Sequence, residues 1–364
     1  MYLESVTVYD HSLDPVASIH GWSSFIWTER YQEVGEFEIR IPDSNPDLLG
    51  YLDTYMDKFI KIPYSEETMI VEEIAYEGGR SDSAVYIRGR DAKTILNRRV
   101  LVATSTIPYG PTTDEVLRQV FDDEIANPSE KGRQIDLVRF DNPSSWKSHH
   151  LDYDVKGHSV WDLFLYCAQI YRCGLRTYWR DGKIRFQFWG PRERSGIGGS
   201  FPVVFSEETS TLTNIVYRKT SATYRTSAYV HVEGGPNNSV VINEDVSNRF
   251  GKGLNRREMF VDPGWNNMSQ LSDNSAIRQS LRPYGRSALY KQAFFDNITG
   301  EVKRNGLYTY GLDRDFFLGD RVALEVGGRR QYARIKEYTF SWTIENGFIG
   351  YPTLDSSPVG DTFM

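Results

Sequence analysis

Short runs of alternating polar and apolar residues fill the first hundred positions, and this pattern most constrains the fold. Residues 36–42, EFEIRIP, place their apolar side chains on one side of an extended chain, because successive side chains of a strand point to opposite faces. Residues 59–62, 69–74 and 85–88 continue the pattern. Several short strands joined by polar turns, without a long helix, predict an antiparallel barrel or sandwich.

The middle of the chain has a different character, because two amphipathic helices are predicted there. Thr112 and Glu115 have the spacing of a capping box, and apolar residues at helical spacing follow them. Ser159 has the residue type of an N-cap, and the helix it opens is expected to run from Val160 to Arg172, near Gly174 as its C-terminal cap. Residues 105–199 are therefore predicted to form a mixed α/β domain.

The rest of the sequence predicts a second β unit that is interrupted by an insertion. Strands at 214–218 and 228–232 are too few to close a barrel, and about four more follow residue 308. We expect the strands before and after the insertion to share a ladder. The predicted domains are a first β-barrel at 1–104, the mixed domain at 105–199, a second, discontinuous barrel at 200–240 and 305–364, and an inserted helical or irregular domain at 241–304.

Turns and helical segments within these units can also be predicted. Asp181-Gly182 and Gly327-Gly328 are typical of tight hairpins. A helix is expected over 273–295, with a break at Pro283. A short strand is expected over 308–310.

Composition excludes some function classes. The formal net charge is -7 and the pI is near 5.5, which argues against a protein that binds nucleic acid by neutralising phosphates. The same balance suits a surface past which nucleic acid slides without adhering. The carboxylate excess is therefore expected to lie partly on any face that meets DNA.

The number of cysteines and the hydropathy of the sequence indicate in which cellular compartment the chain folds. Cys167 and Cys173 lie six residues apart in a predicted helix, so their side chains point to different faces and do not bridge. Both are expected to be reduced and buried. No run approaches the roughly 20 apolar residues that span a bilayer, and the N-terminus lacks the features of an export signal. We therefore expect the chain to fold in a cytoplasm.

One cluster has the residue types of a metal or hydrolytic site. Residues 149–158, HHLDYDVKGH, offer imidazoles and carboxylates. In an extended segment His150, Asp152 and Asp154 share one face, which makes them weak candidates for metal ligands. The favoured interpretation is a polar strand that leads into the helix at Ser159. Because no other catalytic or phosphate-binding motif is present, we predict no enzymatic activity and no cofactor.

The tryptophans allow two interpretations, a buried core or exposed platforms for sugars. Tryptophans in periodic segments are expected to be buried, namely Trp161, Trp179, Trp189 and Trp342. Those in irregular stretches leave glycan binding open, namely Trp22, Trp146 and Trp265.

Two segments resemble a known family. Residues 25–39, FIWTERYQEVGEFEI, resemble the N-terminal signature of siphophage tail-hub proteins, an aromatic-rich strand followed by G-x-F-E. Residues 315–322, DFFLGDRV, look like the D-[YF]-x-L-G-D-x-V motif of the same family, and 345–353 match its usual ending. The motif positions are read as structural: Gly319 suits a positive φ and Asp320 suits backbone hydrogen bonds. These positions are Trp27, Gly35, Phe37, Leu318, Gly319 and Asp320.

The resemblance implies a baseplate-hub fold, with two tube-type antiparallel β-barrels, peripheral α/β domains and a homotrimeric ring. It also implies a structural role in the virion. The trimer would close the distal end of the tail tube, and phage DNA would pass its lumen without specific binding. Implied partners are the distal tail protein, the tape-measure protein and other tail-tip or fibre proteins, with assembly in the host cytoplasm.

Two other functions stay open from sequence. A tail-associated cell-wall hydrolase would use the 149–158 cluster, and a glycan- or receptor-binding tail protein would use exposed aromatic side chains.

Three chains with two related barrels each would give six similar positions in a ring, in which every open strand edge is paired.

Overall fold

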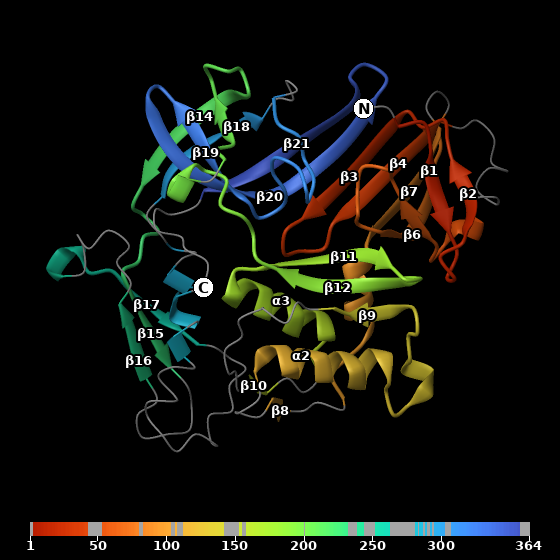
Figure 1. The fold of residues 1–364 in the computed structure, drawn as a ribbon, viewed down its shortest axis with the longest axis horizontal. Helices are drawn as coiled ribbons and strands as arrows, with labels where there is room; N and C mark the ends of the chain where they lie inside the picture. Colours follow the sequence, from red (N-terminus) through yellow and green to blue (C-terminus); the bar gives the residue numbers. More distant parts are fainter. Residues whose placement is uncertain are drawn as a thin grey trace.

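The computed structural model describes most of the chain. The described residues are 3–42, 53–79, 83–102, 106–107, 112–141, 153–154, 158–199, 201–231, 239–243, 252–262, 281–282, 284–286, 288–289, 292, 295–302 and 307–356. The structure is mostly β, and the mixed α/β unit lies against one end of the largest sheet (Figure 1). In the described part, no helix has the length and apolar character needed to cross a membrane.

Eleven strands form this largest sheet, which we call the main sheet. Its order is β13-β19-β20-β3-β4-β7-β6-β5-β1-β2, and β21 also pairs with β20. The bounds are β1 (Val6–Tyr9), β2 (Pro15–Ile19), β3 (Ser24–Arg30), β4 (Glu36–Pro42), β5 (Phe59–Lys61), β6 (Met69–Glu77), β7 (Ala84–Asp91), β13 (Val204–Ser206), β19 (Arg321–Val326), β20 (Arg329–Thr343) and β21 (Gly347–Ser356).

Strand β20 joins the two ends of the sequence in this sheet. Residues 329–334 pair with β19, residues 337–343 pair with β3, and β21 pairs along 333–343. The segments expected to form two barrels therefore share one continuous sheet. Within the described strands the ladders run from β13 to β2 without closing, so the two-barrel arrangement stays a prediction.

Alternation along the strands decides which face of the main sheet is buried. Phe25 and Trp27 on β3, and Phe37 and Ile39 on β4, all point into one core, as the period of two predicts. Phe25 and Trp27 stack with ring centroids 6.3 Å apart. Burying such a side chain stabilises the fold by roughly 1.5–3 kcal/mol.

The mixed unit has its own core. Its sheet has the order β11-β12-β9, with β9 parallel to β12, and both helices share an apolar cluster with that sheet. The bounds are α2 (Thr113–Phe121), β9 (Val138–Phe140), α3 (Val160–Tyr171), β11 (Gly174–Arg180) and β12 (Lys183–Trp189), and β8 (Thr106–Ile107) pairs with β10 (Tyr153–Asp154).

Both predicted helix starts are confirmed. Thr112 and Glu115 form a capping box, and Ser159 forms another with Asp162. A single π-helical turn, Asp122–Ala126, extends α2. The other short helical turns are η1 (Asp53–Tyr55), η2 (Ala92–Arg98), η4 (Lys131–Arg133), η5 (Ile197–Gly199) and η6 (Gly253–Asn255).

The predicted extent of the second helix, 160–172, agrees with α3 to within one residue, but the predicted cap residue is wrong. Arg172, not Gly174, takes the left-handed conformation, with φ of 53°. The Tyr31 hydroxyl donates to the Arg172 carbonyl oxygen at 2.8 Å, and that contact satisfies a carbonyl at the helix end. Gly174 instead begins β11. Cys167 and Cys173 are free and buried, as predicted.

Both predicted hairpins are present. Asp181 and Gly182 have φ of 52° and 66°, and Gly327 and Gly328 have φ of 54° and 73°. These values are the left-handed conformations that two-residue turns between twisted strands require.

The predicted pairing around the insertion is wrong. β14 (Leu212–Thr220) pairs with β18 (Phe295–Val302), and β15 (Ser227–His231) pairs with β16 (Ser239–Asn243) and β17 (Glu258–Val261). The described strands of 214–232 thus share no ladder with those of 308–344. The link between residues 200–240 and the C-terminal strands is instead β13, which pairs in parallel with β19.

Two smaller predictions in this region also need correction. The helix expected up to residue 295 overlaps β18, because Phe295 already pairs with Thr220. Residues 308–310 contribute a single bridge, Tyr310 with Phe316, rather than a strand. The expected break at Pro283 lies outside the described residues.

Candidate functional site: the charged face of the main sheet

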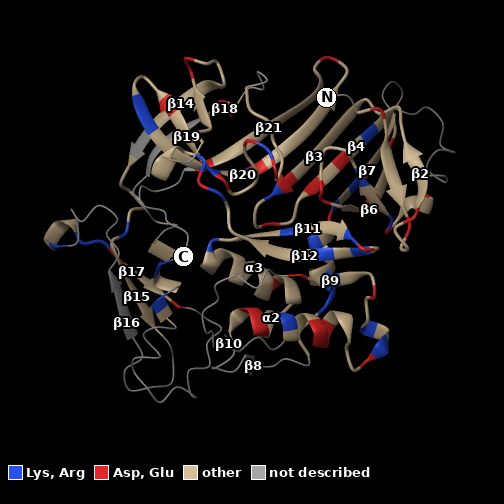
Figure 2. Cartoon of the chain, in the orientation of Figure 1, with Lys and Arg blue, Asp and Glu red and all other residues tan. Residues whose placement is uncertain are grey.

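The side of the main sheet opposite its core carries charged residues. Figure 2 shows red and blue segments on neighbouring strands of this sheet. Because polar positions alternate with core positions, ladder pairing brings glutamates opposite arginines, such as Glu38 opposite Arg88. We call this set the charged face: Arg30, Glu36, Glu38, Arg40, Glu72, Glu73, Glu77, Arg88, Arg90 and Glu337.

Arg88 lies at the centre of the charged face. Its Nε is 2.6 Å from Glu38 Oε2, its Nη1 is 2.9 Å from Glu73 Oε1, and its Nη2 is 3.5 Å from Glu77 Oε1. The guanidinium also lies 4.5 Å from the centroid of the Tyr86 ring. Hydrogen bonding to Glu38 raises the pKa of Arg88, so the charge is held and fully paired.

Arg30 connects the N-terminal strands to β20. It contacts Glu36 Oε1 at 2.5 Å and Glu337 Oε1 at 3.1 Å, and it donates to the Val34 carbonyl at 2.8 Å. Arg90 makes two contacts with Glu72, at 2.6 and 3.2 Å. These two guanidinium groups are therefore already paired with carboxylates and are less available to bind a phosphate.

The chemical consequence concerns surface charge rather than stability. Each exposed pair contributes at most about 1 kcal/mol. A face whose guanidinium groups already have carboxylate partners, however, offers few free cations for the counterion release that drives binding to DNA. The charged face can therefore border nucleic acid without holding it.

The family-motif turn is built around Gly319 and Asp320. Gly319 has φ of 80°, and a Cβ there would lie 2.1 Å from Cε2 of Tyr31. Asp320 accepts from the Phe317 amide at 2.9 Å, from the Arg192 amide at 2.8 Å and from Arg192 Nη2 at 2.6 Å. Both residues thus lie in a tightly packed turn, and Leu318, which precedes them, is fully buried.

The N-terminal motif positions are also core positions. Trp27 is fully buried, and its ring centroid is 6.1 Å from that of Phe37. Gly35 donates its amide to Asp91, and a Cβ at Gly35 would lie 2.4 Å from the Thr28 carbonyl oxygen. A larger residue at position 35 would therefore push β3 away from the end of β7.

The predicted metal candidates receive no geometry from the structure. His150 and Asp152 lie outside the described residues, and Asp154 belongs to β10, where it pairs with Thr106. Among the residues that are described, no group of three His, Cys, Asp or Glu side chains could hold a metal ion.

Most of the tryptophans are described, and they lie inward. Trp22, Trp27 and Trp161 are buried, while Trp179, Trp189 and Trp342 are partly buried. The core interpretation is thus supported for Trp161, and Trp22 is buried although its segment is irregular. Trp146 and Trp265, which left glycan binding open, lie outside the described residues.

Sequence reasoning used the alternating strands for the fold and missed the charged face. The signal was present, because Glu36 and Glu38 on one strand and Arg88 and Arg90 on another occupy the polar positions of the pattern. Recognising the pairs needs the order β4-β7-β6, in which β7 lies between its two carboxylate-bearing neighbours.

The fold is shared with solved phage tail proteins. The chain is similar to a tail protein from Neisseria meningitidis MC58, with a TM-score of 0.61 and 13% identity over 99% of this chain and 98% of that one. It is also similar to the 43 kDa tail protein of prophage MuSo2 from Shewanella oneidensis, with a TM-score of 0.59 and 10% identity over 97% of both chains. The E. coli c3393 protein has a TM-score of 0.51 and 9% identity over 97% of this chain and 77% of that one.

The model of the Siphovirus ReqiPepy6 Gp37-like protein family matches residues 5–348, and the chain belongs to this family. Family and fold together confirm the resemblance to siphophage tail proteins. The chain thus combines membership of a siphovirus protein family with the fold of solved phage tail proteins. No curated protein sequence matches it.

Proposed function

We propose that the chain is the hub of the tail tip, a homotrimeric ring that closes the distal end of the tail tube. In this proposal the charged face borders the passage through which DNA leaves. The similar c3393 protein is a type VI secretion component described as structurally similar to the T4 tail proteins gp27 and gp5. That likeness supports placing this chain at a tube end rather than along the tube.

The charged face is the observation that carries the proposal. It contains more carboxylates than guanidinium groups, and Arg30, Arg88 and Arg90 all have carboxylate partners. A passage lined in this way repels phosphates at short range and gives DNA no row of cations to follow. The remaining parts of the proposal are two tube-type barrels in each chain and contacts with the distal tail protein, the tape-measure protein and fibre proteins.

An image of the assembled tail tests the placement. We expect a threefold ring coaxial with the tail tube, with Glu38 and Arg88 at the wall of the channel. A ring in which these side chains point outward, or a chain present as a single copy away from the tail axis, contradicts the proposal.

Charge reversal tests the function of the face. The double variant Glu36→Lys, Glu38→Lys places cations on it, so we expect DNA to leave the particle more slowly and purified subunits to retain DNA at low salt. The matched control is Glu207→Lys, Glu208→Lys, because both glutamates are exposed in the turn after β13. Equal slowing in both variants would show that the charge acts without regard to position.

A further inference from the structure

A buried group of ionisable side chains lies where three parts of the chain meet. We call it the junction cluster, and at least Glu29, Glu67, Asp91, Lys93 and Thr177 in it are 0–3% exposed. Its members come from β3, from the loop before β6, from the end of β7, from η2, from β11 and from the segment before β19. They are Glu29, Glu67, Asp91, Lys93, Thr177 and Tyr310.

Lys93 and Asp91 form the fixed part of the junction cluster. Lys93 Nζ lies 3.1 Å from Asp91 Oδ2 and donates to the Arg30 carbonyl at 3.0 Å. Asp91 also accepts from the amides of Gly35 and Lys93. This ammonium and this carboxylate therefore have their main partners within the N-terminal part of the main sheet and η2.

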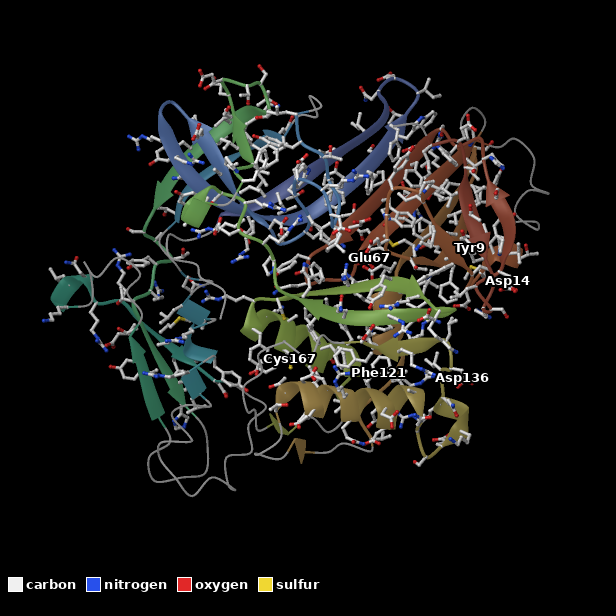
Figure 3. All side chains as sticks on the ribbon, in the orientation of Figure 1. Tyr9, Asp14, Glu67, Phe121, Asp136 and Cys167 are labelled. Carbon is white, nitrogen blue, oxygen red and sulfur yellow. The ribbon has the colours of Figure 1, made fainter. Side chains whose placement is uncertain are left out.

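Glu67 makes the connection to the mixed unit. Its Oε2 accepts from Thr177 Oγ1 at 2.5 Å, and the Thr177 amide lies 3.3 Å from both carboxylate oxygens. Figure 3 shows Glu67 next to the β11–β12 hairpin, on the side of the main sheet. The neighbouring Glu66 contacts Arg176 at 3.3 Å, but that carboxylate is about half exposed.

Glu29 supplies the third carboxyl group of the junction cluster, and it connects β3 to the segment before β19. Tyr310 donates its hydroxyl to Glu29 Oε2 at 2.6 Å, and the Tyr310 ring stacks on Tyr338 with centroids 3.6 Å apart. Burial raises the pKa of Glu29 and holds the pKa of Tyr310 far above its usual range.

The charges of the junction cluster do not balance if every carboxyl group is ionised. Three carboxyl groups then share the site with one ammonium group, in surroundings that disfavour charge. Burial raises the pKa of Glu67 to about 7, against the partial opposition of Lys93 and Thr177. The charged or titratable groups facing Glu67 are Lys93, Asp91 and Glu29. Lys61 on β5 is a second cation nearby, and its charge interacts with Glu67, Glu66 and Glu29.

We propose that Glu67 forms a pH-dependent contact between the main sheet and the mixed unit. When Glu67 is protonated, its carboxyl group stays buried against Thr177 and holds β11 in place. When Glu67 is ionised, the buried negative charge favours local opening, because an opened carboxylate reaches water. The contact uses no side chain of the charged face, and it does not depend on the hub assignment.

The direction of the pH effect follows from the two pKa values. The closed state binds the proton with a pKa of about 7, whereas an opened Glu67 has the ordinary value of 4.5. Stability of the contact is complete below pH 4.5, falls as the pH rises through 7, and falls no further above that. Between pH 5.5 and 8.0 the opening equilibrium should rise about 30-fold.

Hydrogen exchange on the full chain tests this contact. After correction for the intrinsic exchange rate, we expect the β11 amides to show the 30-fold rise and the amides of α2 to show none. Glu67→Gln should remove the rise, since the amide cannot ionise. Glu66→Gln is the matched control and should keep it. A rise that persists in Glu67→Gln, or its absence in the wild type, overturns the proposal.

A second variant keeps the test decisive if Glu67→Gln does not fold. Thr177→Val removes the hydroxyl that stabilises the ionised carboxylate and leaves Glu67 in place. The pKa of Glu67 should then rise further, so the midpoint of β11 opening should move to higher pH than in the wild type. A midpoint that stays in place, or moves down, shows that Glu67 does not control the opening.

Discussion

The charged face and the junction cluster are built from the same residue types and behave in opposite ways. On the charged face, Arg88 keeps 31% of its side chain exposed and is surrounded by carboxylates, so water screens every pair. In the junction cluster, Lys93 and Asp91 are both fully buried, and the surrounding carboxyl groups outnumber the ammonium. Burial, rather than residue type, decides whether a charge shapes a surface or controls stability.

Removing the buried ammonium should give the largest effect. In Lys93→Met the carboxyl groups of Asp91 and Glu67 lose their cation, and we expect the free energy of unfolding to fall by about 3–5 kcal/mol. Chemical denaturation measures this. Arg90→Met on the charged face is the control, and its cost should stay below about 1 kcal/mol. Equal costs would break the comparison between the two regions.

The pH dependence of unfolding should give the next largest effect. Because Glu67 has a pKa of about 7 in the folded chain and 4.5 as its ordinary value, stability should fall by about 3 kcal/mol between pH 4.5 and pH 8. Glu67→Gln should flatten that part of the profile. Thermal unfolding at a series of pH values measures it, and an unchanged slope in the variant would assign the dependence to another group.

Asp320 is an intermediate case, a buried carboxylate with its own guanidinium. It is 1% exposed, yet it accepts from Arg192 and from the Phe317 amide. Asp320→Asn keeps the shape and loses the charge-assisted bonds, so we expect a cost of about 1–3 kcal/mol. Denaturation at two salt concentrations checks it, because the cost should change little with salt. A strong salt dependence would place Asp320 with the surface pairs.

The smallest effect is expected on the charged face itself. A double-mutant cycle with Glu38→Gln and Arg88→Met should give a coupling energy of about 0.2–1 kcal/mol that falls as salt is added. Unfolding of the four proteins measures it. A coupling energy that is larger and does not change with salt would mean that the charged face is shielded from solvent in the isolated chain.

Much of the local structure was predictable because its causes are local. The capping boxes at Thr112 and Ser159 and the hairpin at Asp181-Gly182 depend on residues only a few positions apart. These features need no knowledge of where distant segments lie.

The strand order and both charge sites were not predictable because they depend on distant segments. β18 lies in a polar stretch that gives a weak strand signal, so its pairing with β14 was missed. Glu67 and Thr177 are 110 positions apart, and neither is unusual in its own segment. Only the packing of β11 against the loop before β6 turns an ordinary glutamate into a titrating group.

The position of β20 also determines when this chain can finish folding. Thr28 on β3 faces Thr339 on β20, a separation of 311 residues, so one edge of β3 has no partner until nearly the whole chain has been synthesised. Contacts of such long range fold slowly, and an unpaired edge invites pairing with other chains. A ribosome that stops before residue 329 releases a chain with that edge of β3 open, and chains that stop there should aggregate while the complete chain does not.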